Sequence, residues 1–162
     1  MTAPKIRVVF DVNVFVDALV GPDSTFPLIR EVPPPTSNAA MDTFSLAYDG
    51  FNFALYVSPH ILRNAGRVFE TAGLSSELSA DVLQTLVEIV HFSGGSVVDP
   101  ERTVFEVKDF EDNLVLDLVK AVDAQVVVTS DRDLLDLNPW NGRLILRPRD
   151  FVQHIIRLKA RY

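Results

Sequence analysis

The apolar residues of this chain fall into two patterns. Four short runs are rich in apolar residues, and several of them are continuously apolar at their centre, which is typical of strands buried on both faces of a sheet. Because such strands occur mainly in parallel sheets, we expect helices to cover both faces. The runs predict strands at about residues 5–10, 54–57, 125–130 and 143–148.

Longer segments repeat their apolar residues every three or four positions, which indicates amphipathic helices. The clearest stripe lies in residues 79–91, where Val82, Leu86 and Val90 share one face. The segment "SPHILRNAGRVFETAG" offers Ser58 as an N-cap and Pro59 at the first helical position. Further helices are predicted at about residues 14–19, 39–48, 111–124 and 150–159, with a short one in "DRDLLDL".

Strands that alternate with helices predict an α/β fold. We expect a three-layer α/β/α sandwich with a central, mostly parallel sheet. A length of 162 residues suits one domain, and we expect a single domain over residues 1–162. Residues 21–38, which contain "PPP", predict a proline-rich insertion that is either a flap over a site or an addition specific to a family.

Composition narrows the class of protein. The chain has no cysteine, which excludes a disulfide framework and a thiolate metal site. No apolar run reaches the roughly 18 residues of a membrane span, and the first residues lack the pattern of a secretory signal, so we expect a cytoplasmic protein. A formal charge of −7 argues against broad, nonspecific binding to nucleic acid.

Three aspartates follow or adjoin predicted strands at the edge where parallel sheets place their ligands. Asp11 and Asp131 come directly after strands, and Asp112 opens a helix in "DFEDN". Carboxylates brought together repel one another unless a cation lies among them, and a set of oxygen ligands favours Mg²⁺ or Mn²⁺ over zinc. Such a cluster can activate water and hold a phosphodiester. Each aspartate can instead simply cap the helix that it begins.

Other polar residues near this edge receive lesser roles. Asn13 and Ser130 are expected as supporting ligands that order a metal-bound water or a side chain. Asp133 is either a further ligand or a solvated helix residue. We expect the remaining acids of these segments to be surface charges, and we assign no catalytic role to the histidines, which show no metal spacing: Asp17, Asp109, Glu111, His60, His91 and His154.

The sequence resembles the PIN domain family in four stretches that match in order, spacing and strand context. These are "VVFDVNVFVDAL", "YVSPHIL", "DFEDNLVLDLVKAVDAQVVVTSDRDLLDL" and "RLILRPRDFV". The third is the most specific, because an aspartate–asparagine pair opens a helix and an apolar strand then leads into "TSDRDLL". The family includes the toxin ribonucleases of VapBC toxin–antitoxin systems.

The resemblance implies an endoribonuclease that depends on Mg²⁺ or Mn²⁺ and hydrolyses RNA phosphodiester bonds, with a cognate antitoxin as a partner and a homodimer as a suggested assembly. It implies that the catalytic metal ligands are Asp11, Asp112 and Asp131. Waters would be oriented by Asn13, Asn64 and Ser130. We expect contacts with the RNA backbone from arginines near the site, namely Arg63, Arg67 and Arg132.

One position departs from the family pattern. The helix after the second strand usually carries a glutamate where this chain has Asn64, so that side of the site lacks its usual charge. Glu70 falls on another face of the same helix and is a poor substitute. This departure leaves open a second hypothesis, a catalytically weakened PIN domain that binds RNA or a protein partner without cleavage.

Two other kinds of phosphoryl chemistry fit the sequence poorly. A receiver domain needs a lysine after a later strand, which no strand end here supplies, and a haloacid-dehalogenase phosphatase needs an aspartate where this chain has Asn13.

Overall fold

The computed structural model describes residues 4–21 and 34–161. Four strands in this part of the chain form one fully parallel sheet in the order β2-β1-β3-β4, which confirms the expected α/β/α sandwich. In the central strand, Val8 pairs with Leu55 on one side and with Val126 on the other. The strands are β1 (Ile6–Phe10), β2 (Phe53–Tyr56), β3 (Val126–Val128) and β4 (Leu144–Leu146).

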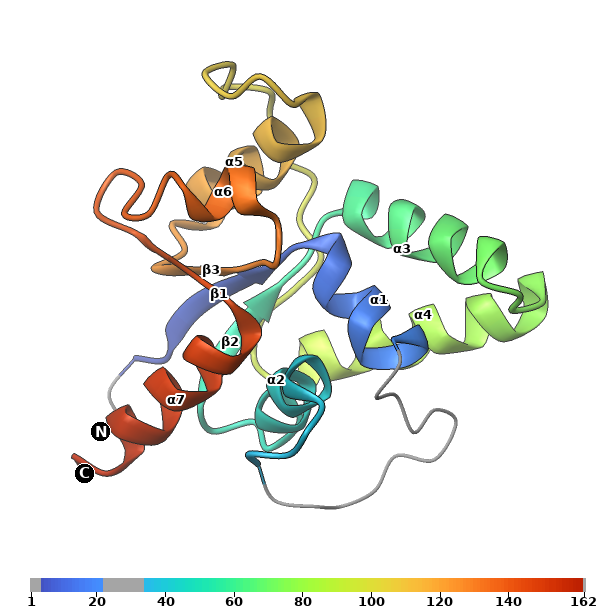
Figure 1. The fold of residues 1–162 in the computed structure, drawn as a ribbon, viewed down its shortest axis with the longest axis horizontal. Coiled ribbons are helices and arrows are strands. Elements are labelled where there is room, and N and C mark those ends of the chain that lie inside the picture. Colours follow the sequence, from blue (N-terminus) through green and yellow to red (C-terminus); the bar gives the residue numbers. More distant parts are fainter. Residues whose placement is uncertain (1–3, 22–33, 162) are drawn as a thin grey trace.

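Helices cover both faces of the sheet (Figure 1). On one face lie α1 (Val12–Val20), α2 (Ala39–Tyr48) and α7 (Pro148–Lys159), and on the other lie α5 (Phe110–Val122) and α6 (Arg132–Leu135). The pair α3 (Pro59–Thr71) and α4 (Ser76–Phe92) packs beside α1 and α2. This arrangement leaves the first turn of α5 facing α3 across the end of β1.

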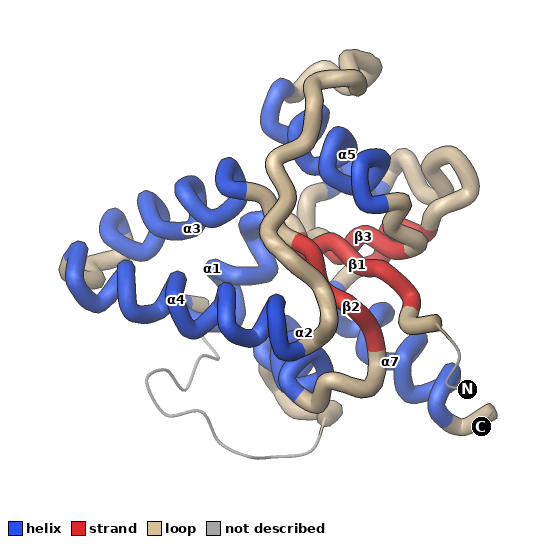
Figure 2. Tube along the Cα trace, turned by 180° about the vertical axis from the view of Figure 1, so that it is seen from behind, coloured by secondary structure: helices blue, strands red, loops and turns tan. Residues whose placement is uncertain are grey.

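Figure 2 shows the long connection from α4 to α5 passing over the β2 side of the sheet. Where it passes, Val57 and Val97 form an isolated parallel bridge. Among the described residues, no helix combines the length and the apolar content needed to cross a membrane.

An aromatic cluster holds the sheet to the face that carries α1, α2 and α7. Its five rings are all buried, with neighbouring ring centroids 5.1–6.4 Å apart, mostly edge to face. Phe10 ends β1 and contacts the other four members, Phe15, Phe44, Phe53 and Phe151. Because the next residue is Asp11, this packing fixes the point at which the chain leaves the core.

Helix starts differ from the predicted starts because the capping residues lie earlier than the apolar stripes suggest. The helix predicted at 14–19 begins at Val12, since Asp11 caps it, and the helix predicted at 79–91 begins at Ser76, since Ser75 caps it. The predicted insertion at 21–38 lies mainly outside the described residues. At its end, the Asn38 side chain accepts a hydrogen bond from the Met41 amide and caps α2.

Candidate metal centre in an acidic cleft

Asp11 lies at the carboxyl edge of the two central strands. Its backbone N–H donates to the carbonyl of Val128 (2.9 Å), which ties the end of β1 to the end of β3. Thr129 continues this ladder, because its N–H donates to the carbonyl of Leu146. The Asp131 N–H then donates to the Thr129 hydroxyl (2.9 Å). Parallel pairing therefore brings Asp11 and Asp131 to one edge, as predicted from their places in the sequence.

The Asp11 carboxylate is held on both oxygens. Oδ1 accepts from the Val12 amide (2.7 Å), so Asp11 does cap α1. Oδ2 accepts from the Thr129 hydroxyl (2.8 Å) and from the Asn13 amide (3.0 Å). The residue is only 7% exposed, and this burial raises the pKa of the carboxyl above its usual value. The Asp11 side chain therefore both caps α1 and belongs to the group of acids at the sheet edge.

Asp112 occupies the first turn of α5, but it does not cap the helix. The cap is Asp109, which accepts from the Glu111 amide (2.8 Å). Asp112 is 4% exposed, and among the described residues its Oδ2 is buried with no hydrogen-bond partner. Burial, followed by the nearby charge of Asp131, raises the pKa of Asp112 to about 7.

The acids converge closely enough to share a cation. Carboxylate oxygens of Asp112, Asp131 and Asp133 lie within 4.8 Å of one another. Asp11 adjoins them, since its charge adds to the rise in the pKa of Asp112. A buried carboxylate oxygen without a donor is the kind of group that a cation satisfies, and an all-oxygen donor set suits Mg²⁺ or Mn²⁺. The residues therefore fit a hard divalent cation.

These acids open into a cleft of about 700 Å³ between the sheet edge, α1, α3 and the first turn of α5. The acidic side carries Asp11, Asp109, Glu111, Asp112 and Asp131. The opposite wall belongs to α3 and includes Arg67, a cation placed to meet an anionic ligand. The arrangement combines carboxylates that can hold a divalent cation with an open cleft beside them.

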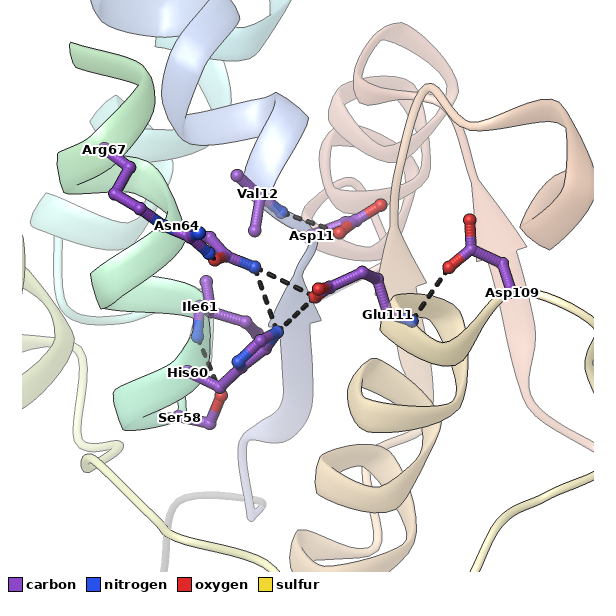
Figure 3. A network of polar contacts seen from close by, with 9 residues as sticks. All are labelled: Asp11, Val12, Ser58, His60, Ile61, Asn64, Arg67, Asp109 and Glu111. Carbon is purple, nitrogen blue, oxygen red and sulfur yellow. Dashed lines mark hydrogen bonds and ion pairs between the residues drawn. The ribbon is translucent and has the colours of Figure 1, made fainter. Parts of the chain in front are cut away.

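A polar network spans the cleft from α5 to α3 (Figure 3). The Glu111 carboxylate pairs with the imidazole of His60 and accepts a hydrogen bond from the Asn64 amide (2.9 Å). Arg67 donates to the carbonyl oxygen of Asn64. Glu111 is half-exposed, as expected of a surface charge. Its carboxylate nevertheless reaches the α3 wall, where the sequence places Asn64 instead of an acidic residue.

Other predicted residues are placed as follows. The side-chain Oδ1 of Asn13 accepts a hydrogen bond from the Ser130 backbone amide (3.0 Å). Ser130 therefore enters the network through its main chain, and the residue is exposed. Arg67 lines the cleft, whereas Arg63 and Arg132 are exposed residues outside its lining. Asp133 lies in the first turn of α6 and belongs to the acidic group.

Three residues of the site escaped the sequence reasoning, namely Thr129, His60 and Glu111. The position of Thr129 could have been recognised from the sequence, because Thr129 directly follows the apolar run of β3 and stands two residues before Asp131. Glu111 and His60 lie 51 positions apart and meet only because the fold places the first turn of α5 across the cleft from α3. No spacing along the chain predicts such a pair.

Comparison with known families gives one match. The model of a family described as PIN domain matches residues 7–133, which is most of the chain and includes every acidic residue that lines the cleft. No curated protein matches the chain.

Proposed function

The chain belongs to the PIN domain family, and from this premise we propose that it is an endoribonuclease dependent on Mg²⁺ or Mn²⁺, the toxin of a type II toxin–antitoxin pair. PIN domains are generally metal-dependent nucleases that bind RNA, so the family supports nuclease chemistry as such. The choice of RNA as the substrate and the toxin role go further and form the proposal.

One observation carries the nuclease part. Asp11, Asp112 and Asp131 come from three separate segments, yet they line one cleft at the sheet edge, and within the described part of the chain the buried Asp112 Oδ2 has no donor. A protein that only needed caps for its helices would not leave a carboxylate in this state, because an unsatisfied buried charge destabilises the fold. A site built for a cation explains why it is retained.

The side chains have distinct tasks in this proposal. Asp11, Asp112 and Asp131 hold the cation, while Thr129 and Asn13 fix the orientation of Asp11. When bound, the cation lowers the pKa of a water molecule and stabilises charge on the scissile phosphate. The Arg67 guanidinium, at the cleft wall, contacts a backbone phosphate of the RNA.

The toxin assignment rests on the resemblance of the four motifs to the PIN domain family, which includes the toxin ribonucleases of VapBC systems. It implies a cognate antitoxin that covers the cleft, a homodimer as the assembly and a cytoplasmic site of action. Induced expression of the chain should therefore stop growth, and Asp11→Ala should restore it at equal protein level. Full toxicity of a folded Asp11→Ala variant would contradict the toxin mechanism proposed here.

Cleavage of an RNA pool during a Mn²⁺ titration tests the nuclease. We expect cleavage by the parent protein, none in EDTA, and a loss of at least about a hundredfold with Asp11→Asn, since the missing charge lies at the cation. Asp17→Asn is the matched control, because it removes the same charge from the exposed side of α1. If Asp11→Asn cleaves as well as the parent, the site is wrong. A parent that binds Mn²⁺ but cleaves no RNA would favour the non-cleaving PIN domain.

A further inference from the structure

Among the residues that the structure describes, the α3 wall of the cleft contributes no acidic side chain. Its lining residues are His60, Ile61, Asn64, Arg67, Val68 and Thr71. A cation held only by the sheet edge and α5 would therefore meet no carboxylate on this side. A carboxylate is nevertheless present at this wall, because Glu111 extends from α5 and contacts it.

Glu111 is held from α3 at two points. His60 and Asn64 lie four positions apart, on the same face of the helix, and both contact the Glu111 Oε2. Arg67 occupies the carbonyl oxygen of Asn64, which turns the Asn64 amide nitrogen toward Glu111. In the described part of the chain, these contacts fall on Oε2, so that Oε1 is left for a further ligand.

Glu111 and Asp112 are consecutive residues that serve the same cleft. Successive positions of a helix point about 100° apart, so Asp112 is buried toward the sheet edge while Glu111 reaches toward α3. Among the described residues, the buried Asp112 Oδ2 has no hydrogen-bond partner, and a cation can satisfy a carboxylate oxygen in this state.

We infer that Glu111 is an additional acidic ligand of the cleft, which binds a divalent cation or its water shell on the α3 side, and that Asn64 and His60 position its carboxylate. This inference rests on the proposed function, because it concerns the cation of the same site. It also explains the departure from the family pattern at Asn64. The carboxylate comes from Glu111 of α5, and Asn64, which stands in place of the usual glutamate, holds it by a hydrogen bond.

Calorimetric titration with Mn²⁺ tests the inference without using activity. We expect Glu111→Gln to weaken Mn²⁺ binding about tenfold, the scale found when groups that orient metal ligands are removed. Glu70→Gln is the matched control, because it removes the same charge from the exposed part of α3 outside the cleft, and its affinity should stay within about twofold of the parent. Thermal unfolding in EDTA shows that each variant is folded.

Moving the charge provides the sharper test. In the double variant Asn64→Glu with Glu111→Gln, the carboxylate stands on α3 itself, and Mn²⁺ affinity should return to within about threefold of the parent. Asn64→Leu removes the amide that holds Glu111 and should weaken binding by less than Glu111→Gln does, because His60 still contacts the Glu111 Oε2.

The outcomes separate the two claims. Parent-like Mn²⁺ binding by Glu111→Gln, together with loss of binding in Asp131→Asn, would overturn the inference and leave the proposed function standing. A folded double variant that binds Mn²⁺ no better than Glu111→Gln would also overturn it. A carboxylate on the α3 side of the cleft would then not contribute to cation binding. If the parent binds no Mn²⁺ at all, the proposed function fails first and the inference fails with it.

Discussion

Replacing Asp112 with asparagine should stabilise the metal-free protein at pH 8. Asp112 is buried, its Oδ2 has no partner among the described residues, and its pKa is raised from 3.8 to about 7. Between about pH 4 and pH 7, the folded state therefore binds one proton more than the unfolded state. The contribution of Asp112 to stability is present at low pH, declines as pH rises through this window, and is gone above about pH 7.

The magnitude follows from the size of this shift. About 3 pKa units at 1.36 kcal/mol each give a ceiling of about 4 kcal/mol for ionising Asp112 in the folded state. The cleft is open to water and its acids can move apart, so we expect about 2 kcal/mol. On this basis, Asp112→Asn gains about 2 kcal/mol in free energy of unfolding at pH 8 and almost nothing at pH 4.

Urea unfolding in EDTA, followed by the fluorescence of the single tryptophan, Trp140, measures this difference at both pH values. Asp117→Asn is the control: it lies on the same helix and is equally buried, but its carboxylate accepts from Arg102 (2.8 Å) and from the backbone amide of Val104 (2.7 Å). That variant should lose about 1–3 kcal/mol. If the Asp112→Asn variant is no more stable than the parent at pH 8, then ionised Asp112 does not destabilise the folded protein and the prediction is wrong.

Three further results are expected. Mn²⁺ affinity should rise from pH 5.5 to 7.5 as Asp112 loses its proton, with proton release visible by calorimetry in buffers of different ionisation enthalpy; a flat profile would contradict this. Thr129→Val removes the hydroxyl that donates to Asp11, so Mn²⁺ binding should weaken about tenfold, whereas Thr103→Val, far from the cleft, should bind like the parent. Phe10→Ala removes the ring at the centre of the aromatic cluster and should cost about 3–5 kcal/mol in urea unfolding, and a loss below about 1 kcal/mol would show that the cluster does not secure β1.

The layers of the fold were predictable because local patterns determine them. Continuous apolar runs marked the buried parallel strands, and the strand ends then placed Asp11 and Asp131 at one edge. Asp112 was predictable for the same reason, since the helix that it opens leads directly into β3.

The α3 side of the site was not predictable, because it depends on how far a side chain reaches between helices. Asn64 correctly indicated that α3 lacks a glutamate at this place. Whether another element fills the gap depends on the distance between α3 and the first turn of α5, which no local pattern records. Ser130 shows a smaller failure of the same kind: it was chosen for its hydroxyl, but the preceding Thr129 is the residue whose hydroxyl faces Asp11.

The pairing of β1 with β3 also has a consequence for the timing of synthesis. Asp11 and Thr129, which hydrogen-bond across this pair, are 118 positions apart. At about 5–20 residues per second, a ribosome takes about 6–24 s to pass from one to the other. During that interval β1 has no neighbour on its β3 side, and the acidic edge lacks Asp131. The cleft is therefore completed only after β3 and Asp131 have left the ribosome, so that a growing chain carries no assembled site before that point.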